Sequence, residues 1–180
     1  MFMEVIQNRR SVRKYQDREV EAEKIDLLIE AALRSPSSRA TYPWRFIVVT
    51  DKNLMEGLSR SKSAGSAFLK DAPLGIVVLA DPEECDVWVE DCSIASIIMH
   101  LTAHFLGLGS CWIQIRKRMH DKEKTAEEYI SDLLGIPSGM TVLSVIAVGY
   151  PDEIKEGHKK ETLMYDRVFA NRFGDSRQAG

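Results

Sequence analysis

The sequence predicts a globular domain in which one β-sheet lies between helical layers. Short β-branched runs alternate along the chain with longer segments of helical periodicity, and this alternation is typical of a sheet covered on both faces. The chain has 180 residues, 44% of them hydrophobic and 28% charged, which suits one domain spanning residues 1–180 with a full apolar core. We find no internal repeat, low-complexity tract or linker that would divide it.

Two helices are expected before the first strand. Residues 5–8 form the end of a short helix, and residues 20–34 repeat their apolar side chains at helical spacing. Ser35 and Pro36 end this second helix, because the residue before a proline is pushed out of the helical region. After a polar loop, residues 46–50 form a short apolar run that predicts a buried strand.

The middle of the chain predicts a helix at residues 53–60, a strand at 74–80 and a long helix at 87–106. The long helix is apolar on most of its sides, so it must be buried on more than one face. In a domain of this size, another subunit is the expected second cover. A glycine-containing turn ends the helix, and residues 110–115 predict the third strand.

The last third of the chain holds one more helix and one more strand. Thr125 and Glu128 fit a capping box that begins a helix ending at Leu134. Residues 140–150 predict the fourth strand. The polar tail from Asp152 carries scattered apolar side chains, which predicts an extended arm lying over a surface.

Composition and charge weigh against several classes of protein. Cys85, Cys92 and Cys111 are odd in number and form no CxxC pair, so we expect them to be reduced and buried, as in a cytoplasmic protein. The N-terminus has no apolar core of signal-peptide length, and no apolar run approaches the ~20 residues that cross a membrane. The formal net charge of −3 weighs against non-specific nucleic-acid binding, which needs excess positive charge.

Positive charge is nevertheless concentrated at residues 8–15, NRRSVRKY. Arg9 and Arg10 offer rigid forks of donors that match phosphate oxygens, and the Ser11 hydroxyl adds one more donor. Two or three charge-assisted hydrogen bonds of roughly 1.5–3 kcal/mol each would anchor a phosphate. On this stretch alone, a phosphate site and a solvated charged surface fit equally well.

Other segments leave their function open when taken singly. PSSRATYPW at residues 36–44 has many backbone donors and small side chains, although an ordinary connecting loop has the same composition. GLGSCWIQI at residues 107–115 lacks the GxGxxG dinucleotide fingerprint, yet its turn could present backbone N–H groups to a ligand. His100 and His104 share one helix face without a third ligand, so we expect a packed pair and no metal site.

The order and spacing of the motifs are more specific than any one of them. RRSVRKY, PSSRATYPWRFIVVTD, GLGSCWIQI and VIAVGYPDE together resemble the nitroreductase family of FMN-dependent flavoproteins, over about residues 5–173. The resemblance implies an α+β fold with three α/β/α layers, a mixed, mainly antiparallel sheet and an extended C-terminal arm exchanged in a homodimer. It also implies that the long apolar helix packs against its dimer mate. FMN would then lie in two sites at the interface, each drawing on both chains.

The same resemblance assigns residues to the phosphate, the ribityl chain and the flavin ring. Arg9, Arg10 and Ser11 are expected to hold the FMN phosphate and ribityl chain. Arg13 is expected near flavin N1 and O2, where its charge favours the anionic reduced flavin. The partner chain is expected to line the ring and ribityl chain with Pro36, Ser37, Ser38 and Arg39.

Residues later in the chain complete the implied site. Gln114 and Ile115 lie where a backbone N–H points at flavin N5. His158 and Lys160 lie where the family often has basic residues closing on the phosphate. Residues 59–71, rich in Ser, Gly and Ala, are expected to form a mobile cover near the site.

The function that the resemblance implies is hydride transfer from NAD(P)H through flavin N5 to an electron-poor acceptor, such as a nitroaromatic or a quinone, by a ping-pong mechanism. The flavin carries this chemistry, so no side chain is assigned as nucleophile or general acid, and Arg13 gives electrostatic support.

Two alternatives stay open beside this function. Ala40 and Tyr42 stand where relatives often have Asn and Gln, and Gln114 stands where short relatives often have Gly. These departures motivate an FMN storage or sensor protein with little turnover. A nucleic-acid module using the basic cluster is a third hypothesis, against which the acidic total and the lack of a known nucleic-acid motif weigh.

Overall fold

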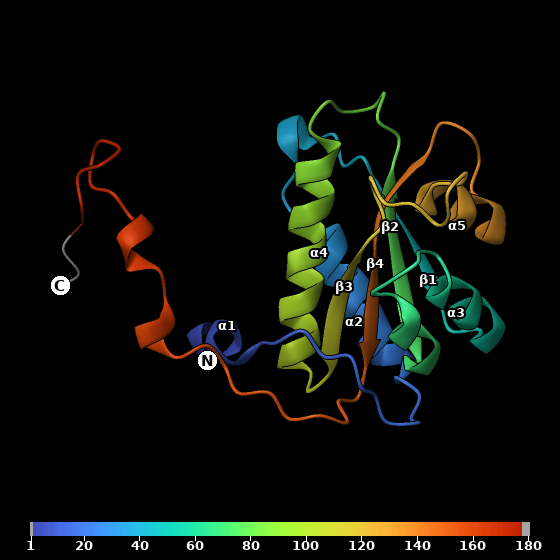
Figure 1. Ribbon diagram of the computed structural model, residues 1–180, viewed down its shortest axis with the longest axis horizontal. Coiled ribbons are helices and arrows are strands. Elements are labelled where there is room, and N and C mark those ends of the chain that lie inside the picture. The colour runs from blue at the N-terminus through green and yellow to red at the C-terminus, as the bar shows by residue number, and fades with distance from the viewer. Residues whose placement is uncertain (1, 178–180) are drawn as a thin grey trace.

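A computed structural model describes residues 2–177 of the chain. Its centre is a four-stranded sheet in the order β1-β2-β4-β3, in which all neighbouring strands pair antiparallel (Figure 1). The strands are β1 (Trp44–Val49), β2 (Leu74–Ala80), β3 (Gly109–Gln114) and β4 (Thr141–Gly149). An isolated parallel bridge joins Ser11 to Ser110, so the N-terminal segment extends the sheet at its β3 edge.

Helices cover both faces of the sheet, which confirms the three-layer α+β fold (Figure 1). In chain order they are α1 (Phe2–Asn8), α2 (Ala22–Leu33), α3 (Lys52–Ser59), α4 (Trp88–Phe105) and α5 (Ala126–Leu134). The α2 and α4 helices pack on one face, and α3 and α5 pack on the other. The predicted capping box forms at α5: Thr125 Oγ1 accepts the Glu128 N–H at 3.1 Å, and the Thr125 N–H donates to the Glu128 carboxylate at 2.8 Å.

The core lies on both sides of the central strands β2 and β4. Ile76 and Val78 of β2 belong to the cluster beneath α2 and α4, while Val77 and Leu79 belong to the cluster beneath α3 and α5. Every residue of β2 is buried, which explains why its sequence is a continuous apolar run without alternation. The three cysteines are free and buried, as expected.

Replacing the fully buried Ile146 of β4 with alanine is expected to lower the free energy of unfolding by about 2–5 kcal/mol, because it leaves a cavity in the cluster beneath α2 and α4. Val48→Ala is the matched control on edge strand β1, where the valine is 42% exposed. It should change the free energy by less than about 1 kcal/mol. Urea unfolding of both variants at one protein concentration measures the difference, and equal losses would contradict this placement of Ile146.

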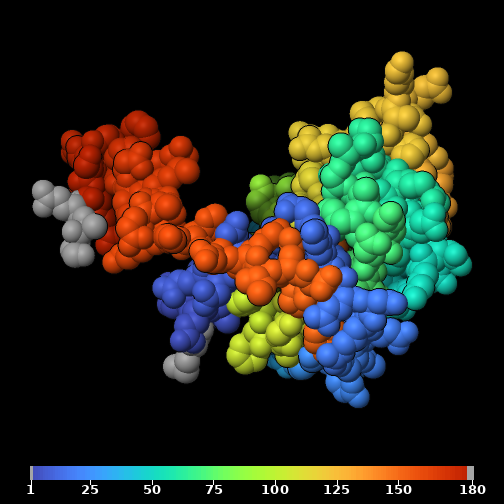
Figure 2. Space-filling model, turned by 60° about the horizontal axis from the view of Figure 1, so that its bottom comes forward, coloured from blue at the N-terminus to red at the C-terminus, as the bar shows by residue number. Residues whose placement is uncertain are grey.

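After β4 the chain first follows the N-terminal segment and then leaves the body of the molecule. Arg10 donates a hydrogen bond to the Glu156 carbonyl. A β-carbon at Gly157 would lie 2.2 Å from the Gln7 carbonyl oxygen, so glycine is needed for the chain to pass α1 this closely. Figure 2 shows the rest of the arm standing apart from the domain. Residues 158–168 are all exposed, so this part of the arm covers no surface of its own chain, and its exchange in a dimer stays a prediction.

Candidate functional site

The basic cluster, residues 8–15, is held in place by the segment that follows β4. The Lys155 ammonium donates to the Ser11 carbonyl at 2.7 Å, and the Glu153 carboxylate accepts the Arg13 N–H at 2.6 Å. That N–H and the neighbouring Lys155, 2.9 Å away, hold the pKa of Glu153 below its usual range. Lys155 and Glu153 were not assigned from the sequence, where they stand among other charges of a polar tail. They fix the backbone from which Arg9 and Arg10 project.

A cavity of about 190 Å³ opens between this cluster, the C-terminal end of α4 and the start of β3. Its lining is Asn8, Arg9, Arg10, Val12, His104, Gly107, Leu108, Gly109, Ser110, Pro151, Glu153 and Lys155. Cationic groups therefore outnumber carboxylates around it, and two guanidinium groups supply forked donors. This donor set suits a phosphate. Of the three residues predicted to hold the phosphate and ribityl chain, Arg9 and Arg10 line this cavity and Ser11 does not.

His100 is buried behind this cavity, with its Nδ1 atom 2.7 Å from the Ser110 hydroxyl. Burial, with a smaller contribution from the nearby charge of Arg9, lowers the pKa of His100 to about 4. The imidazole is therefore neutral near pH 7. Across residues 2–177, no group of His, Cys, Asp or Glu side chains is arranged to hold a metal ion.

Acidification below pH 6.5 is expected to destabilise the protein through His100. An unfolded histidine binds its proton near pH 6.5, whereas the folded one does so only near pH 4, so the unfolded state gains protons first as the pH falls. This group alone should remove roughly 3 kcal/mol from the free energy of unfolding across that window. His100→Gln should flatten this part of the pH profile of the apoprotein, as measured by urea unfolding at a series of pH values. Superimposable profiles for the wild type and His100→Gln would contradict the assignment.

The Gln114 side chain at the far end of β3 is tied to its own strand. Trp112 Nε1 donates to Gln114 Oε1 at 2.9 Å, and Gln114 Nε2 donates to the Arg116 carbonyl at 3.0 Å. Both polar ends of the side chain are therefore occupied by neighbours in the sequence.

The backbone at this point distinguishes Gln114 from Ile115. The Ile115 N–H donates to the Leu143 carbonyl at 3.1 Å and so faces the sheet. The Gln114 carbonyl faces the open edge instead, where it accepts the Lys62 ammonium at 3.1 Å. In a strand the N–H and C=O of one residue point to the same side, so the Gln114 N–H also faces the open edge. Of the two predicted N5 contacts, only Gln114 offers its N–H at that edge.

The segment expected to be a cover, residues 59–71, is packed against this end of β3. Ser61 and Leu69 are fully buried, and the buried Ser66 hydroxyl donates to the Ser59 carbonyl at 2.8 Å. Lys62 is half-buried, and burial lowers its pKa. The Ser- and Gly-rich sequence around Lys62 does not predict that its side chain reaches β3.

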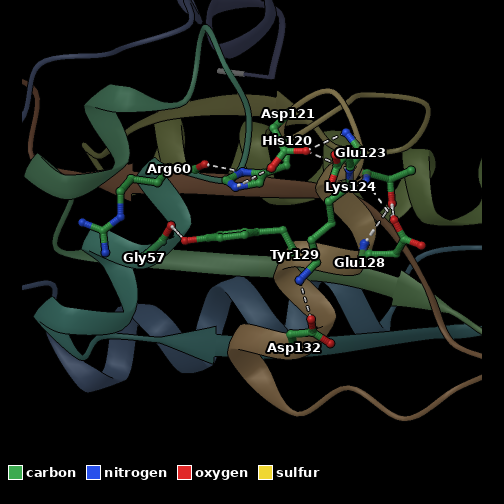
Figure 3. A network of polar contacts seen from close by, with 10 residues as sticks. Gly57, Arg60, His120, Asp121, Glu123, Lys124, Glu128, Tyr129 and Asp132 are labelled. Atoms are coloured by element: carbon green, nitrogen blue, oxygen red, sulfur yellow. Dashed lines mark hydrogen bonds and ion pairs between the residues drawn. The ribbon is translucent and has the colours of Figure 1, made fainter.

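The loop after β3 is held by the polar network of Figure 3. His120 Nδ1 lies 2.9 Å from the Arg60 carbonyl, and the imidazole stacks on Tyr129 with ring centroids 4.1 Å apart. The Tyr129 hydroxyl donates to the Gly57 carbonyl at 3.1 Å. This network joins the loop to α3 and α5, away from the cavity.

The second predicted ligand loop lies at the opposite end of α4 from the cavity. Ser38 is tied to Asp91 in the first turn of α4, whereas His104 in the last turn lines the cavity. A helix of 18 residues is about 27 Å long. One chain therefore does not bring Pro36, Ser37, Ser38 and Arg39 to Arg9 and Arg10. The predicted His158 and Lys160 lie exposed in the arm and do not line the cavity.

Ile94, Ile97 and Phe105 form an exposed apolar stripe along α4, with exposed fractions of 36%, 45% and 77%. None of the helices in residues 2–177 is long and apolar enough to cross a membrane.

Comparison with known proteins matches the chain to the nitroreductase family model over residues 6–65 and 55–150. A protein of Methanothermobacter thermautotrophicus named "Putative NADH dehydrogenase/NAD(P)H nitroreductase" is 42% identical, over 84% of this chain and 78% of that relative. A protein of the same name from Archaeoglobus fulgidus is 37% identical, over 88% and 90%. The solved structure of an FMN-dependent nitroreductase from Clostridium difficile R20291 is 48% identical with a TM-score of 0.94, covering 95% of this chain and 99% of that one. With this fold and these similarities, the chain belongs to the nitroreductase family.

Proposed function

We propose that the protein is an FMN-dependent oxidoreductase that oxidises NAD(P)H and reduces an electron-poor acceptor, such as a nitroaromatic or a quinone, by a ping-pong mechanism. The observation that carries this proposal is the cavity lined by Arg9, Arg10 and Lys155 beside the edge of β3, in a chain of the nitroreductase family. FMN, when bound, supplies the hydride chemistry. The residues of the chain bind and orient it.

The donor set around the cavity fits the phosphate of FMN. Arg9 and Arg10 would hold the phosphate through their guanidinium forks, with Lys155 adding charge behind them. Arg13 lies farther along the same segment, 5.9 Å from the centre of the Phe68 ring, and would supply positive charge on the ring side. The Gln114 N–H on the open edge of β3 would donate to the ring. His158 and Lys160 of the arm would close on the phosphate.

The site is complete only in a homodimer, which we propose for two reasons. The exposed apolar stripe of Ile94, Ile97 and Phe105 needs a cover, and a second copy of α4 supplies one. If the two α4 helices pack antiparallel, the N-terminal end of one lies at the C-terminal end of the other. The partner's loop at residues 36–39 would then reach the cavity beside Arg9. The free, buried cysteines fit the reducing cytoplasm, where we propose the protein acts.

Steady-state oxidation of NADH or NADPH in the presence of menadione or nitrofurazone tests this function against storage or sensing of FMN. We expect turnover at ordinary enzyme rates of about 1–1,000 s⁻¹ with at least one nucleotide and one acceptor. If the protein binds one FMN per chain but oxidises neither nucleotide, the proposed enzymatic function would be contradicted.

A further inference from the structure

Asp91 is a buried acid that does not line the cavity. It lies in the first turn of α4 and is 2% exposed, and within residues 2–177 it is the one carboxylate among the buried polar side chains. Burying a carboxyl group is unfavourable unless hydrogen bonds replace those to water. The neighbouring acid of the same turn, Glu90, is exposed to solvent.

The two oxygens of Asp91 join α4 to two other segments. Oδ1 accepts the Ser38 N–H at 3.0 Å, and Oδ2 accepts the Cys85 thiol with Sγ 3.6 Å away. The carboxylate also lies near the helix N-terminus, where unpaired backbone N–H groups favour negative charge. Asp91 therefore links the 37–42 loop and the turn after β2 to one fixed helix.

The loop that Asp91 holds has an unusual backbone. Arg39, Ala40 and Tyr42 have φ angles of 53°, 53° and 49°, in the left-handed region that residues other than glycine seldom adopt. Such conformations persist only where the surroundings enforce them, and they cluster at ligand-binding sites. Inside the loop, the Ser37 hydroxyl accepts the Tyr42 N–H at 3.0 Å.

The links from the loop to α4 and to the turn before it differ in their exposure to solvent. One is the buried hydrogen bond from Ser38 to Asp91. Arg39 adds an ion pair with Asp86, in which the two side chains are 64% and 75% exposed, and an interaction with Cys85. Solvent screens an exposed pair of this kind strongly. The buried Asp91 carboxylate is therefore better shielded from solvent than the ion pair.

We propose that Asp91 is a positioning residue for FMN binding. Its carboxylate holds the 37–42 loop in the conformation in which Arg39, Ala40 and Tyr42 are left-handed. Ser37, Ser38 and Arg39 then meet the FMN held by the partner subunit's Arg9 and the partner subunit's Arg10. The inference rests on the proposed function, since it takes that loop to be part of a shared flavin site. Asp91 touches no flavin itself and acts through the Ser38 backbone.

Titration of the full-length apoprotein with FMN, followed by quenching of flavin fluorescence, tests the proposal. Asp91→Ala should weaken FMN binding at least about tenfold, because it frees the loop. Asp91→Asn should recover most of the affinity, since its amide oxygen can still accept the Ser38 N–H. Glu23→Ala, which removes an exposed acid in the first turn of α2, is the matched control and should bind FMN like the wild type.

Two further readouts separate positioning from plain stability. Hydrogen–deuterium exchange should rise in residues 37–42 of Asp91→Ala and stay at the wild-type level in Glu23→Ala. Light scattering should give the wild-type mass for both. If Asp91→Ala fails to fold, Asp91→Ser replaces it, since serine keeps a polar group but is too short to reach the Ser38 N–H.

A lower melting temperature with unchanged FMN affinity and unchanged loop exchange would overturn the proposal, because Asp91 would then be only structural. A wild-type protein that binds no FMN would instead overturn the proposed function and the flavin role with it. The exchange measurement would still decide whether Asp91 fixes the loop, so the two failures are distinguishable.

Discussion

Replacing Arg9 with alanine is expected to weaken FMN binding by about ten- to a hundredfold. Arg9 lines the cavity beside Arg10, and a hydrogen bond between charged groups contributes about 1.5–3 kcal/mol, of which each 1.4 kcal/mol is a factor of ten in affinity. Because the cavity keeps Arg10 and Lys155, the loss should be large without being complete. Fluorescence titration of the apoprotein measures it.

Riboflavin, which lacks the phosphate, is the sharpest control for this prediction. If Arg9 contacts the phosphate, Arg9→Ala should leave riboflavin affinity within about threefold of the wild type. Arg34→Ala removes one exposed arginine that pairs with Glu30 on α2, so it tests the change in net charge alone and should affect neither ligand. Equal losses of affinity for FMN and riboflavin would show that Arg9 does not contact the phosphate. Unchanged FMN affinity would show that Arg9 is not part of the site.

Ile97→Asp is expected to separate the homodimer and to abolish FMN binding with it. Ile97 lies in the middle of the exposed stripe on α4, and an unpaired carboxylate buried in an apolar interface costs several kcal/mol, on the order of the energy that holds many dimers together. The flavin is lost as well because each site is proposed to use both chains. Light scattering gives the mass, and the visible spectrum of the purified variant gives the FMN content.

Val48→Asp is the matched control for the dimer prediction. Val48 is 42% exposed on edge strand β1, close to the 45% of Ile97, so both variants add one carboxylate at a similar exposed apolar position. The control should remain dimeric and keep its FMN. A dimeric Ile97→Asp protein would place the interface elsewhere, and a monomer that still binds FMN tightly would contradict the shared site.

Much of the fold follows from local sequence signals. Thr125 and Glu128 predict the capping box because both partners lie within one helical turn. The central strand β2 is apolar along its whole length, and β4 is apolar apart from Thr141 and Ser144, because both strands are covered on both faces; that pattern is visible without the structure. Each expected helix and strand ends within about two residues of its prediction, and α4 shows apolar side chains beyond those its own chain covers.

The details of the site depend on contacts that local patterns do not encode. Asp91 and Glu90 are adjacent acids of one helical turn, and only the packing of the 37–42 loop buries one of them. Whether Gln114 or Ile115 faces the open edge depends on strand register, since a shift by one residue exchanges the two sides. Lys62 meets the end of β3 across a separation of 52 residues.

The most direct test of the central claim is the absorption spectrum of the purified full-length protein, recorded before and after anaerobic addition of NADH and then NADPH. We expect a flavin spectrum in the visible that one or both nucleotides bleach and that an electron-poor acceptor restores. A flavin spectrum that neither nucleotide bleaches would contradict the oxidoreductase, and a colourless protein that also refuses added FMN would contradict the flavin site itself.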